Sequence, residues 1–425
     1  MKKIFNLALL TVQLLLFAQS VNAQRWARIY DSPVTVYNFT ETVNTAPEIV
    51  NIFYNTQGEH FRDPLAPRFI LTDREGKWGL GIGGYLMGRA EVDFDKVVDN
   101  VDFMPSQIQR GSGASSQYQM DITTSTLFLK LVGRSRMLGD FQLFTSADWR
   151  GNGKNLRLLN AYLRTKHVTL GYTTGNFMDL AAYPATVDYA GPCGMTFYRT
   201  TQLALNFNLF KGMTMGVAVE SPGVSAASDA FANVGTQTFP NIPIYFKYEL
   251  YDDSHVRVGG ILRDMSYRNL ISGGRRQKIA WGAQASTLMT FGKFQVSGQY
   301  SIGEGIGSLV NNISNEGVDL VPVPDNNGQM MMLLSDAWFA ALHYNISNST
   351  FVSATYSQTN LYSRRGYAGE NPDKYKRGQY LAVNMFTMAS DNLQLGVEYL
   401  HGWRVDFDEH TYNANRINIS ARYNF

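Results

Sequence analysis

The fold is decided by the stretch RINISARYNF, Arg416–Phe425, in which apolar and polar side chains alternate without interruption. Its odd-numbered positions hold Ile, Ile, Ala, Tyr and Phe, and its even-numbered positions hold Arg, Asn, Ser, Arg and Asn. A period of two is that of a β-strand, whose side chains point alternately to its two faces. Because Arg416 and Arg422 are costly to remove from water, the polar face should be wet. The stretch therefore predicts a strand with one apolar and one hydrated face.

The same alternation occurs in Gln202–Leu209, Ile244–Tyr251 and Phe294–Ile302. The apolar face could meet the core of a soluble sandwich or the lipid around a membrane barrel, so alternation alone does not decide. Three observations favour the barrel. The segments are about 10 to 15 residues long, whereas soluble strands average about 5 to 6. Their ends carry Trp, Tyr and Phe, as at membrane interfaces, and tight turns alternate with long polar connections.

The part of the chain from Lys77 to Phe425 has room for roughly sixteen strands at about 22 residues per strand and connection, and bacterial barrels have an even number. We therefore predict an all-β fold, a transmembrane antiparallel up-and-down β-barrel of about 16 strands. A barrel of this size leaves an aqueous lumen, which predicts a pore.

Composition agrees with a membrane barrel. Charged residues make up 17% of the chain and aromatic residues 13%, whereas soluble domains have about 25% charged residues. With 37 basic and 35 acidic residues, no nucleic-acid-binding surface is expected. The single cysteine, Cys193, excludes an internal disulfide framework, and we interpret it as a small buried side chain.

The N-terminus predicts export. Lys2 and Lys3 precede an apolar run that ends at Val21-Asn22-Ala23, as in a cleaved signal peptide over residues 1–23. Residues 24–76 lack the sustained alternation, and we expect them to form an extension on the periplasmic side or in the lumen. Residues 77–425 are the predicted barrel. The expected location is the outer membrane of a Gram-negative bacterium.

One long connection stands out. Gly171–Gln202 holds several glycines and prolines between two alternating segments, which predicts an ordered loop folded into the barrel as a constriction. Its candidate constriction residues are Arg199, Asp179, Asp188 and Gln202. The three charged residues could contact solute, or they could form an ion pair between the loop and the wall.

Strand phase also predicts the residues that point into the lumen and set selectivity. These candidates are Arg157, Arg257, Arg263, Arg404, Arg416, Arg422 and Glu398. Uncompensated cations in a water-filled channel raise the local anion concentration. We therefore expect passive, weakly anion-preferring diffusion of small hydrophilic solutes.

Scattered motifs in a fixed order give a family resemblance. They are Gly171, Phe177, Asp179, Pro184, Asp188, Gly191, Pro192, Arg199 and Gln202, then Val258–Asp264, Gly303–Gly307, Gly396–Tyr399 and the terminal Tyr423-Asn-Phe425. Together they resemble the DcaP-like trimeric outer-membrane porins. The resemblance implies a homotrimer in lipid and carboxylated solutes such as dicarboxylic acids. The chain departs from the family at Arg157-Leu-Leu159, where one lumen arginine is missing.

Catalysis is not expected, because the chain has no HExxH, GxSxG or P-loop motif. No cofactor and no metal are predicted. Two alternatives stay open. One is a barrel hydrolase of the phospholipase or protease type, using His401 near Asp406 or His343 with nearby serines. The other is a non-conducting structural or receptor barrel whose lumen is filled by the N-terminal extension.

Overall fold

A computed structural model describes residues 35–38, 46–56, 58, 60–67, 69–73, 77–98, 100–111, 115–251, 253–325 and 327–425. The predicted signal peptide lies outside the described residues. Four short elements precede or cover the barrel: β1 (Thr35–Asn38), α2 (Ala46–Asn55), β2 (Phe69–Thr72) and α3 (Tyr367–Glu370). None of the described helices has the length and apolar character needed to cross a membrane.

The structure confirms the predicted all-β fold, an antiparallel barrel of 16 strands. Its strands are β3 (Trp78–Phe94), β4 (Ser116–Asp121) with β5 (Thr126–Ser135), β6 (Gly139–Asp148), β7 (Arg157–Thr165), β8 (Val168–Thr174), β9 (Arg199–Phe210), β10 (Met213–Glu220), β12 (Ile242–Glu249), β13 (His255–Asn269), β14 (Arg275–Phe291), β15 (Phe294–Glu304), β18 (Leu334–Asn345), β19 (Thr350–Tyr362), β20 (Tyr375–Met388), β21 (Leu393–Asp406) and β22 (Thr411–Asn424). β4 and β5 are two parts of one strand, because both pair with β3 at successive positions.

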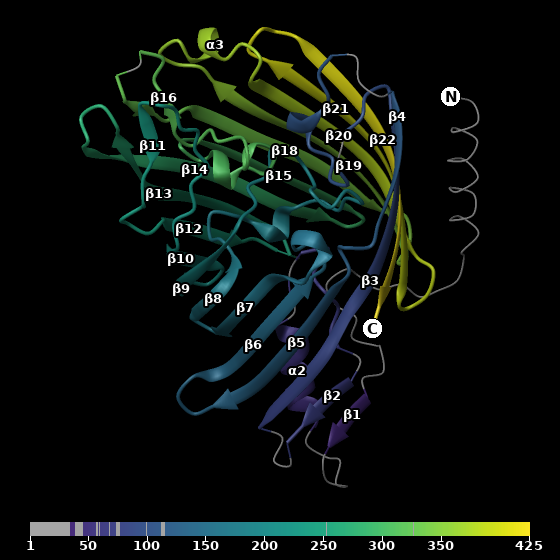
Figure 1. The fold of residues 1–425 in the computed structure, drawn as a ribbon. Helices are drawn as coiled ribbons and strands as arrows, with labels where there is room; N and C mark the ends of the chain where they lie inside the picture. The colour runs from purple at the N-terminus through teal and green to yellow at the C-terminus, as the bar shows by residue number, and fades with distance from the viewer. Residues whose placement is uncertain are drawn as a thin grey trace.

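The barrel closes between its first and last strands (Figure 1). Tyr85–Phe94 of β3 pairs antiparallel with Asn415–Asn424 of β22. The C-terminal stretch that predicted a strand is therefore the closing strand. At the lower end of β3, β2 takes the position beyond the end of β22, and β1 pairs parallel with β2.

The two ends of the barrel differ in their connections. Turns of a few residues, such as 211–212, 292–293 and 389–392, join strands at the lower end in Figure 1. The upper end carries the longer connections, including residues 221–241 with β11 (Ala232–Val234) and residues 305–333. Short turns face the periplasm and long loops face outward in bacterial barrels.

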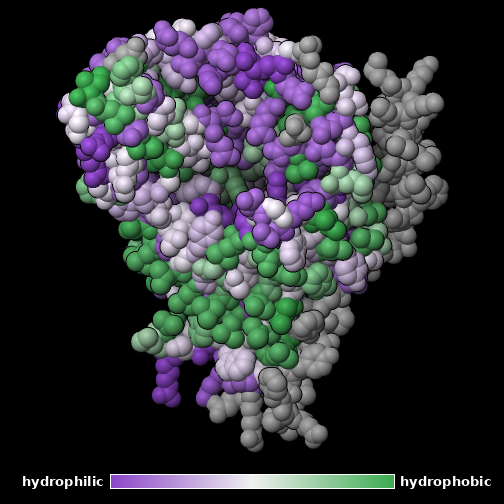
Figure 2. Space-filling model, viewed as in Figure 1, coloured by the Kyte–Doolittle hydropathy of each residue, from purple (hydrophilic) through white to green (hydrophobic). Residues whose placement is uncertain are grey.

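The alternation separates the two faces of the wall as predicted. In β9, Leu203, Leu205 and Phe207 are 45%, 36% and 42% exposed, whereas Gln202 and Ala204 are 4% and 2% exposed. Figure 2 shows hydrophobic residues gathered on the middle and lower part of the visible face, with hydrophilic residues above them. The apolar set therefore faces outward, where lipid surrounds an outer-membrane barrel.

The barrel interior is partly filled by three loops. The constriction loop is residues 175–198, with η3 (Leu180–Ala182). The second loop includes residues 305–325 and 327–333, with η4 (Gly307–Leu309), η5 (Asn311–Ile313), β16 (Val321–Pro322) and β17 (Met330–Met331). The third follows β3 and includes residues 95–98 and 100–111, with η1 (Pro105–Gln107). A short turn, η2 (Asn152–Lys154), joins β6 to β7. The buried apolar core lies between these loops and the inner wall.

Candidate pore constriction

The constriction loop runs inside the barrel between β8 and β9. Phe177 is 2% exposed, and Val187 and Cys193 are fully buried. Gly191 has a φ of 75°, a conformation that glycine adopts without strain. At Gly194 a Cβ atom would collide with the backbone of Trp338 in β18. These glycines let the loop turn and pack directly on the wall.

Asp179 anchors the start of the loop to the wall. Its Oδ2 lies 2.8 Å from Nε2 of His255 and accepts a hydrogen bond of 2.6 Å from Ser286. Burial alone would raise the pKa of Asp179, but the His255 bond, the nearby Arg257 charge and the Ser286 bond together lower it to about 2. Asp179 is therefore ionised and fixed at neutral pH.

Glu398 of β21 anchors the middle of the loop. Its two oxygens accept hydrogen bonds from the backbone N–H groups of Val187 at 3.0 Å and Asp188 at 2.7 Å. Asn384 and Asn418 donate to the same carboxylate at 3.0 and 3.1 Å. The Glu398 carboxylate therefore joins the backbone of the loop to two asparagines of the barrel wall.

Asp188 is buried at this anchor, 1% exposed. Its carboxylate accepts from the backbone N–H of Phe103 at 3.0 Å and of Gly191 at 3.2 Å. Burial and the charge of Asp102 raise the pKa of Asp188, and the hydrogen bond from Phe103 and the charges of Arg62 and Arg89 oppose that rise. Asp188 therefore joins the constriction loop to the loop that follows β3.

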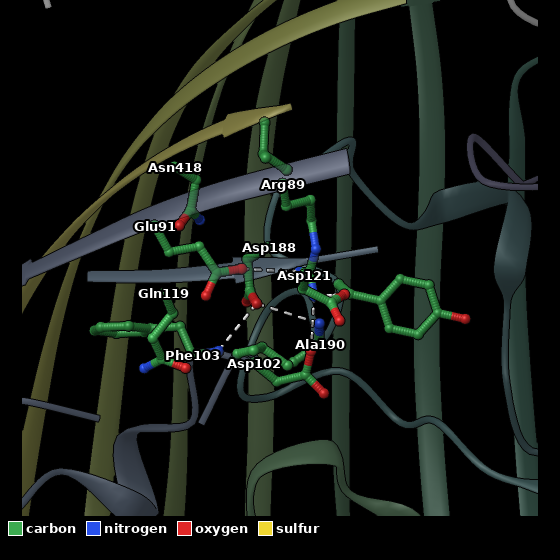
Figure 3. Close-up of polar contacts among 12 residues, drawn as sticks. Arg89, Glu91, Asp102, Phe103, Gln119, Asp121, Asp188, Ala190 and Asn418 are labelled. Atoms are coloured by element: carbon green, nitrogen blue, oxygen red, sulfur yellow. Dashed lines mark hydrogen bonds and ion pairs between the residues drawn. The ribbon is translucent and has the colours of Figure 1, made fainter. Parts of the chain in front are cut away.

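Figure 3 shows the polar cluster around this junction. Arg89 of β3 lies 3.0 Å from Asp121, 3.5 Å from Glu91 and 3.8 Å from Asp102. Nε and Nη1 of this arginine have no hydrogen-bond partner among the described residues. The cluster lies beside Asp188 and crosslinks β3, β4 and the loop between them.

The second loop fills a further part of the lumen, and its inward course was not predicted from the sequence. The backbone N–H groups of Asn311 and Asn312 donate to the carbonyls of Met195 at 2.9 Å and Cys193 at 3.1 Å. The Asn311 amide donates to the carbonyls of Ala190 at 3.0 Å and Pro192 at 3.2 Å. The constriction is therefore a composite of two loops.

A cavity of about 690 Å³ remains beside the loops, along the wall formed by β5 to β12. Among the described residues, nine cationic side chains and four carboxylates line it. The cations are Arg62, Lys130, Arg150, Arg157, Arg164, Lys166, Arg199, Lys247 and Arg257, and the carboxylates are Asp63, Asp102, Asp179 and Glu249.

Only some of these cations have carboxylate partners. Arg150 lies 2.6 Å from Asp102, and Arg157 lies 2.5 Å from Asp148. Arg199 differs from both. Its guanidinium lies 4.9 Å from the ring centroid of Phe197, and its Nε has no hydrogen-bond partner in the described part of the chain. Arg199 is partly buried and lines the cavity.

A model of the DcaP outer membrane protein family matches residues 96–425. The chain belongs to this family. It is therefore an outer-membrane channel of the DcaP family, and the family resemblance inferred from the scattered motifs is confirmed. No curated protein matches the chain in sequence.

Solved structures share the fold of this DcaP-family channel. The outer membrane channel DcaP of Acinetobacter baumannii is 18% identical, with a TM-score of 0.72 over 83% of this chain and 98% of that one. An anion-selective porin from Comamonas acidovorans is 10% identical, with a TM-score of 0.54 over 82% and 100%. OmpT of Vibrio cholerae is 12% identical, with a TM-score of 0.51 over 82% and 98%.

In the DcaP-family channel, the predicted site residues fall into two groups. The first group lines the cavity: Asp179, Arg199, Gln202, Arg157 and Arg257. Gln202 donates to the carbonyl of Thr174 at 2.7 Å, and the Arg257 guanidinium lies 3.9 Å from the ring centroid of Tyr245. The roles of Asp179, Arg199 and Gln202 in the constriction, and of Arg157 and Arg257 in selectivity, stay predictions.

The second group points inward and packs against loops. Asp188, Glu398, Arg263, Arg416 and Arg422 are buried, and Arg404 is partly buried. Arg263 lies 3.4 Å from Asp319 of the second loop. Arg404 holds the loop after β3 through the Ser106 carbonyl at 2.5 Å. Arg416 holds the same loop through the carbonyls of Val98 at 3.0 Å and Asn100 at 2.8 Å, and it also pairs with Asp93 of β3. These arginines anchor loops in the structure, because each meets a carboxylate or a carbonyl of an inward-folded segment.

Sequence reasoning did not select Arg62 or Arg164 as site residues. Arg164 follows Tyr162 by two positions on β7, and its guanidinium lies 4.7 Å from that ring centroid. This spacing places both side chains on one face of the strand, and it was a usable signal. Arg62 lies in the predicted extension, where no period indicates which side chains enter the lumen.

Proposed function

We propose that this channel mediates passive, weakly anion-preferring diffusion of small hydrophilic solutes. The observation that carries the proposal is the excess of cationic side chains over carboxylates along the cavity, with Arg199 unpaired. Fixed cations in a narrow channel with low-dielectric walls raise the local concentration of anions.

We propose small carboxylates, including dicarboxylates, as preferred solutes. Arg199 and Arg164 have no carboxylate partner among the described residues, and guanidinium groups bind carboxylates in a bidentate manner. The anion selectivity of the Comamonas acidovorans porin, which has a similar fold, is consistent with this proposal.

The remaining organisation is also proposed. We infer a cleaved signal peptide over residues 1–23, an N-terminal extension over residues 24–76 and a barrel over residues 77–425, in the outer membrane of a Gram-negative bacterium. A homotrimer is expected, since porins bury part of the apolar wall against neighbours. A trimer form of OmpT from Vibrio cholerae is among the structures with a similar fold.

The test is the reversal potential of the purified channel in a planar bilayer under a KCl gradient, with and without succinate on one side. An anion-selective potential and a succinate-dependent reduction of current are expected. A cation-selective potential would overturn the proposal. A silent bilayer from folded protein would favour the non-conducting alternative.

The form of the hydrolase alternative that uses His401 and Asp406 finds no support in the described residues. Nδ1 of His401 lies 2.6 Å from Asn415, whereas Asp406 pairs with Arg404 at 2.7 Å and Arg110 at 2.8 Å. His401 and Asp406 thus have different partners and do not form the charge pair that a catalytic site of this type needs.

A further inference from the structure

Residues 60–67, here named the lumenal segment, lie inside the barrel rather than beside it. Two cations of the inner wall bind this segment and the end of α2 that precedes it. Arg422 of β22 donates to the carbonyls of Phe61 at 3.3 Å and Asp63 at 3.0 Å. Lys130 of β5 donates to the carbonyls of Phe53 at 3.1 Å and Thr56 at 2.8 Å, at the end of α2. The barrel wall therefore holds this part of the chain from two sides.

Arg62 connects the segment to the constriction loop. Its guanidinium donates to the carbonyls of Asp188 and Tyr189, to the carbonyl of Thr186 at 3.3 Å and to the Thr186 hydroxyl at 2.6 Å. The same group lies 4.9 Å from the ring centroid of Tyr189. One side chain thus satisfies several acceptors in the middle of the loop.

Aromatic packing supports this contact on both sides of Arg62. The Phe61 ring lies 4.8 Å from Phe386 and 6.1 Å from Phe351, both on the inner wall. The His60 ring meets Tyr183 of the constriction loop edge-on at 6.1 Å. Burial first, and then the charges of Arg62, Arg199 and Arg422, lower the pKa of His60 to about 3, so His60 is neutral at physiological pH.

The wall of β3 is shaped for this segment. A Cβ atom at Gly81 would collide with Pro67 and Phe53, and one at Gly79 would collide with Ile49 of α2. By contrast, a Cβ at Gly88 of the same strand meets nothing within 4 Å. Glycine at positions 79 and 81 therefore permits the close approach of α2 and the lumenal segment.

The lumenal segment also forms part of the cavity surface, to which His60, Arg62 and Asp63 contribute. We propose that the lumenal segment binds the constriction loop and thereby sets the width and charge of the pore. Arg62 is the residue that positions the loop. The passage is then built from the barrel, the loops and this N-terminal segment together. This proposal does not depend on which solute the channel carries.

The experiment compares Arg62→Ala and Arg62→Lys in the full-length channel. Lysine keeps the positive charge, but it cannot reach several acceptors with a planar fork. Three quantities are measured: reversal potential in KCl, open-channel current noise, and the rate at which N-ethylmaleimide alkylates Cys193. This thiol is the single cysteine of the chain and is buried in the loop.

For Arg62→Ala we expect about tenfold faster alkylation, more current noise and weaker anion preference, because a locally opened loop exposes Cys193. For Arg62→Lys we expect faster alkylation and more noise with the wild-type reversal potential. Lys211→Ala, in a periplasmic turn, is the charge-matched control and should change none of the three. Wild-type alkylation and noise in both Arg62 variants would overturn the proposal.

Gly81→Val gives a second test from the wall side, with Gly88→Val as its control on the same strand. Displacing the segment should raise conductance about twofold, because a wider passage conducts more ions, and should also speed alkylation. Wild-type conductance and alkylation in a folded Gly81→Val channel would count against the segment as a determinant of pore width. A cation-selective wild type would refute the proposed function but leave the alkylation test valid.

Discussion

Inward-pointing charged side chains have different partners on two sides of the barrel. On the side of β20 to β22, Glu398 holds the backbone of the constriction loop, and Arg416 donates to the carbonyls of Val98 and Asn100 in the loop after β3. On the side of β7 to β9, Arg164 and Arg199 line an open cavity without a carboxylate partner in the described part of the chain. The first side anchors the loops, and the second gives the passage its charge.

Strand phase establishes the direction of a side chain but not its partners. Phase decides that a side chain points inward, and this is the same for Arg416 and Arg164. Whether the charge stays available depends on which loop lies opposite, and that contact joins residues far apart in the chain. An inward cation is therefore a selectivity candidate only where no loop covers it.

The largest effect is expected from breaking the anchor at Glu398. Glu398→Ala leaves the N–H groups of Val187 and Asp188 unsatisfied inside the barrel, which should cost roughly 3 kcal/mol of loop anchoring. The measurement is alkylation of Cys193. Burial raises the pKa of this thiol to about 12 in the wild type, so it should react very slowly there and much faster in the variant.

The matched control for this prediction is Glu249→Ala, an exposed acid at the cavity wall that contacts no part of the constriction loop in the described structure. It should leave the alkylation rate unchanged. Equal rates in wild type and Glu398→Ala would mean that the other loop contacts suffice, and the anchoring role of this side of the barrel would be lost.

A smaller effect is expected at the other end of the loop. The pKa of Asp179 is lowered to about 2 from an ordinary value of 3.8, which corresponds to roughly 2 kcal/mol of anchoring by the ionised form. Because the folded-state pKa is lowered, this anchoring is present above about pH 4 and is lost as the pH falls toward 2. Asp179→Asn should remove it at every pH.

The measurement is open-channel noise between pH 7 and pH 3. Wild type should stay quiet until the pH falls below 4, and Asp179→Asn should be noisy throughout the range. Asp188, whose pKa is raised, should respond in the opposite sense, since its protonation at low pH relieves the repulsion from Asp102. Noise in wild type that rises between pH 7 and pH 5 would contradict the assignment to Asp179.

A smaller effect again is expected from removing a single charge from the cavity. Arg199→Gln removes an unpaired cation from the cavity, and we expect the anion-to-cation permeability ratio to fall by about threefold. The double variant Asp148→Asn with Arg157→Gln removes a pair whose charges cancel, and it should shift the ratio little. Similar reversal potentials for the two variants would remove the distinction between paired and unpaired cations.

Much of this architecture follows from local sequence. The period of two, the terminal RINISARYNF and the alternating connections predict the barrel and its strand count. The glycines and prolines of Gly171–Gln202 predict an ordered inward loop, although β8 and β9 take up both of its ends. These features depend on neighbours in the chain, which the sequence displays directly.

The parts that could not be predicted depend on contacts across the lumen. Asn311 meets Ala190 across more than a hundred residues, and Arg62 meets Thr186 over a similar separation. Arg263 has a predictable inward phase, but its partner Asp319 lies on a loop whose course no periodicity reveals. Loop placement therefore decides the role of Arg263 after strand phase has placed it inside, and it alone places Asn311 and Arg62.

The smallest effect tests where along the passage selectivity arises. Lys166 lies in the turn between β7 and β8, exposed at the periplasmic mouth of the cavity, whereas Arg199 lies beside the constriction loop. Salt screens exposed charges within about 10 Å at 0.1 M ionic strength. Lys166→Gln should therefore change the reversal potential less than Arg199→Gln, and its effect should fade between 0.1 M and 1 M KCl. Equal shifts in reversal potential for the two variants at 1 M KCl would contradict this prediction. Lys166 would then act on ions at close range despite the screening, and the mouth would contribute as much to selectivity as the constriction.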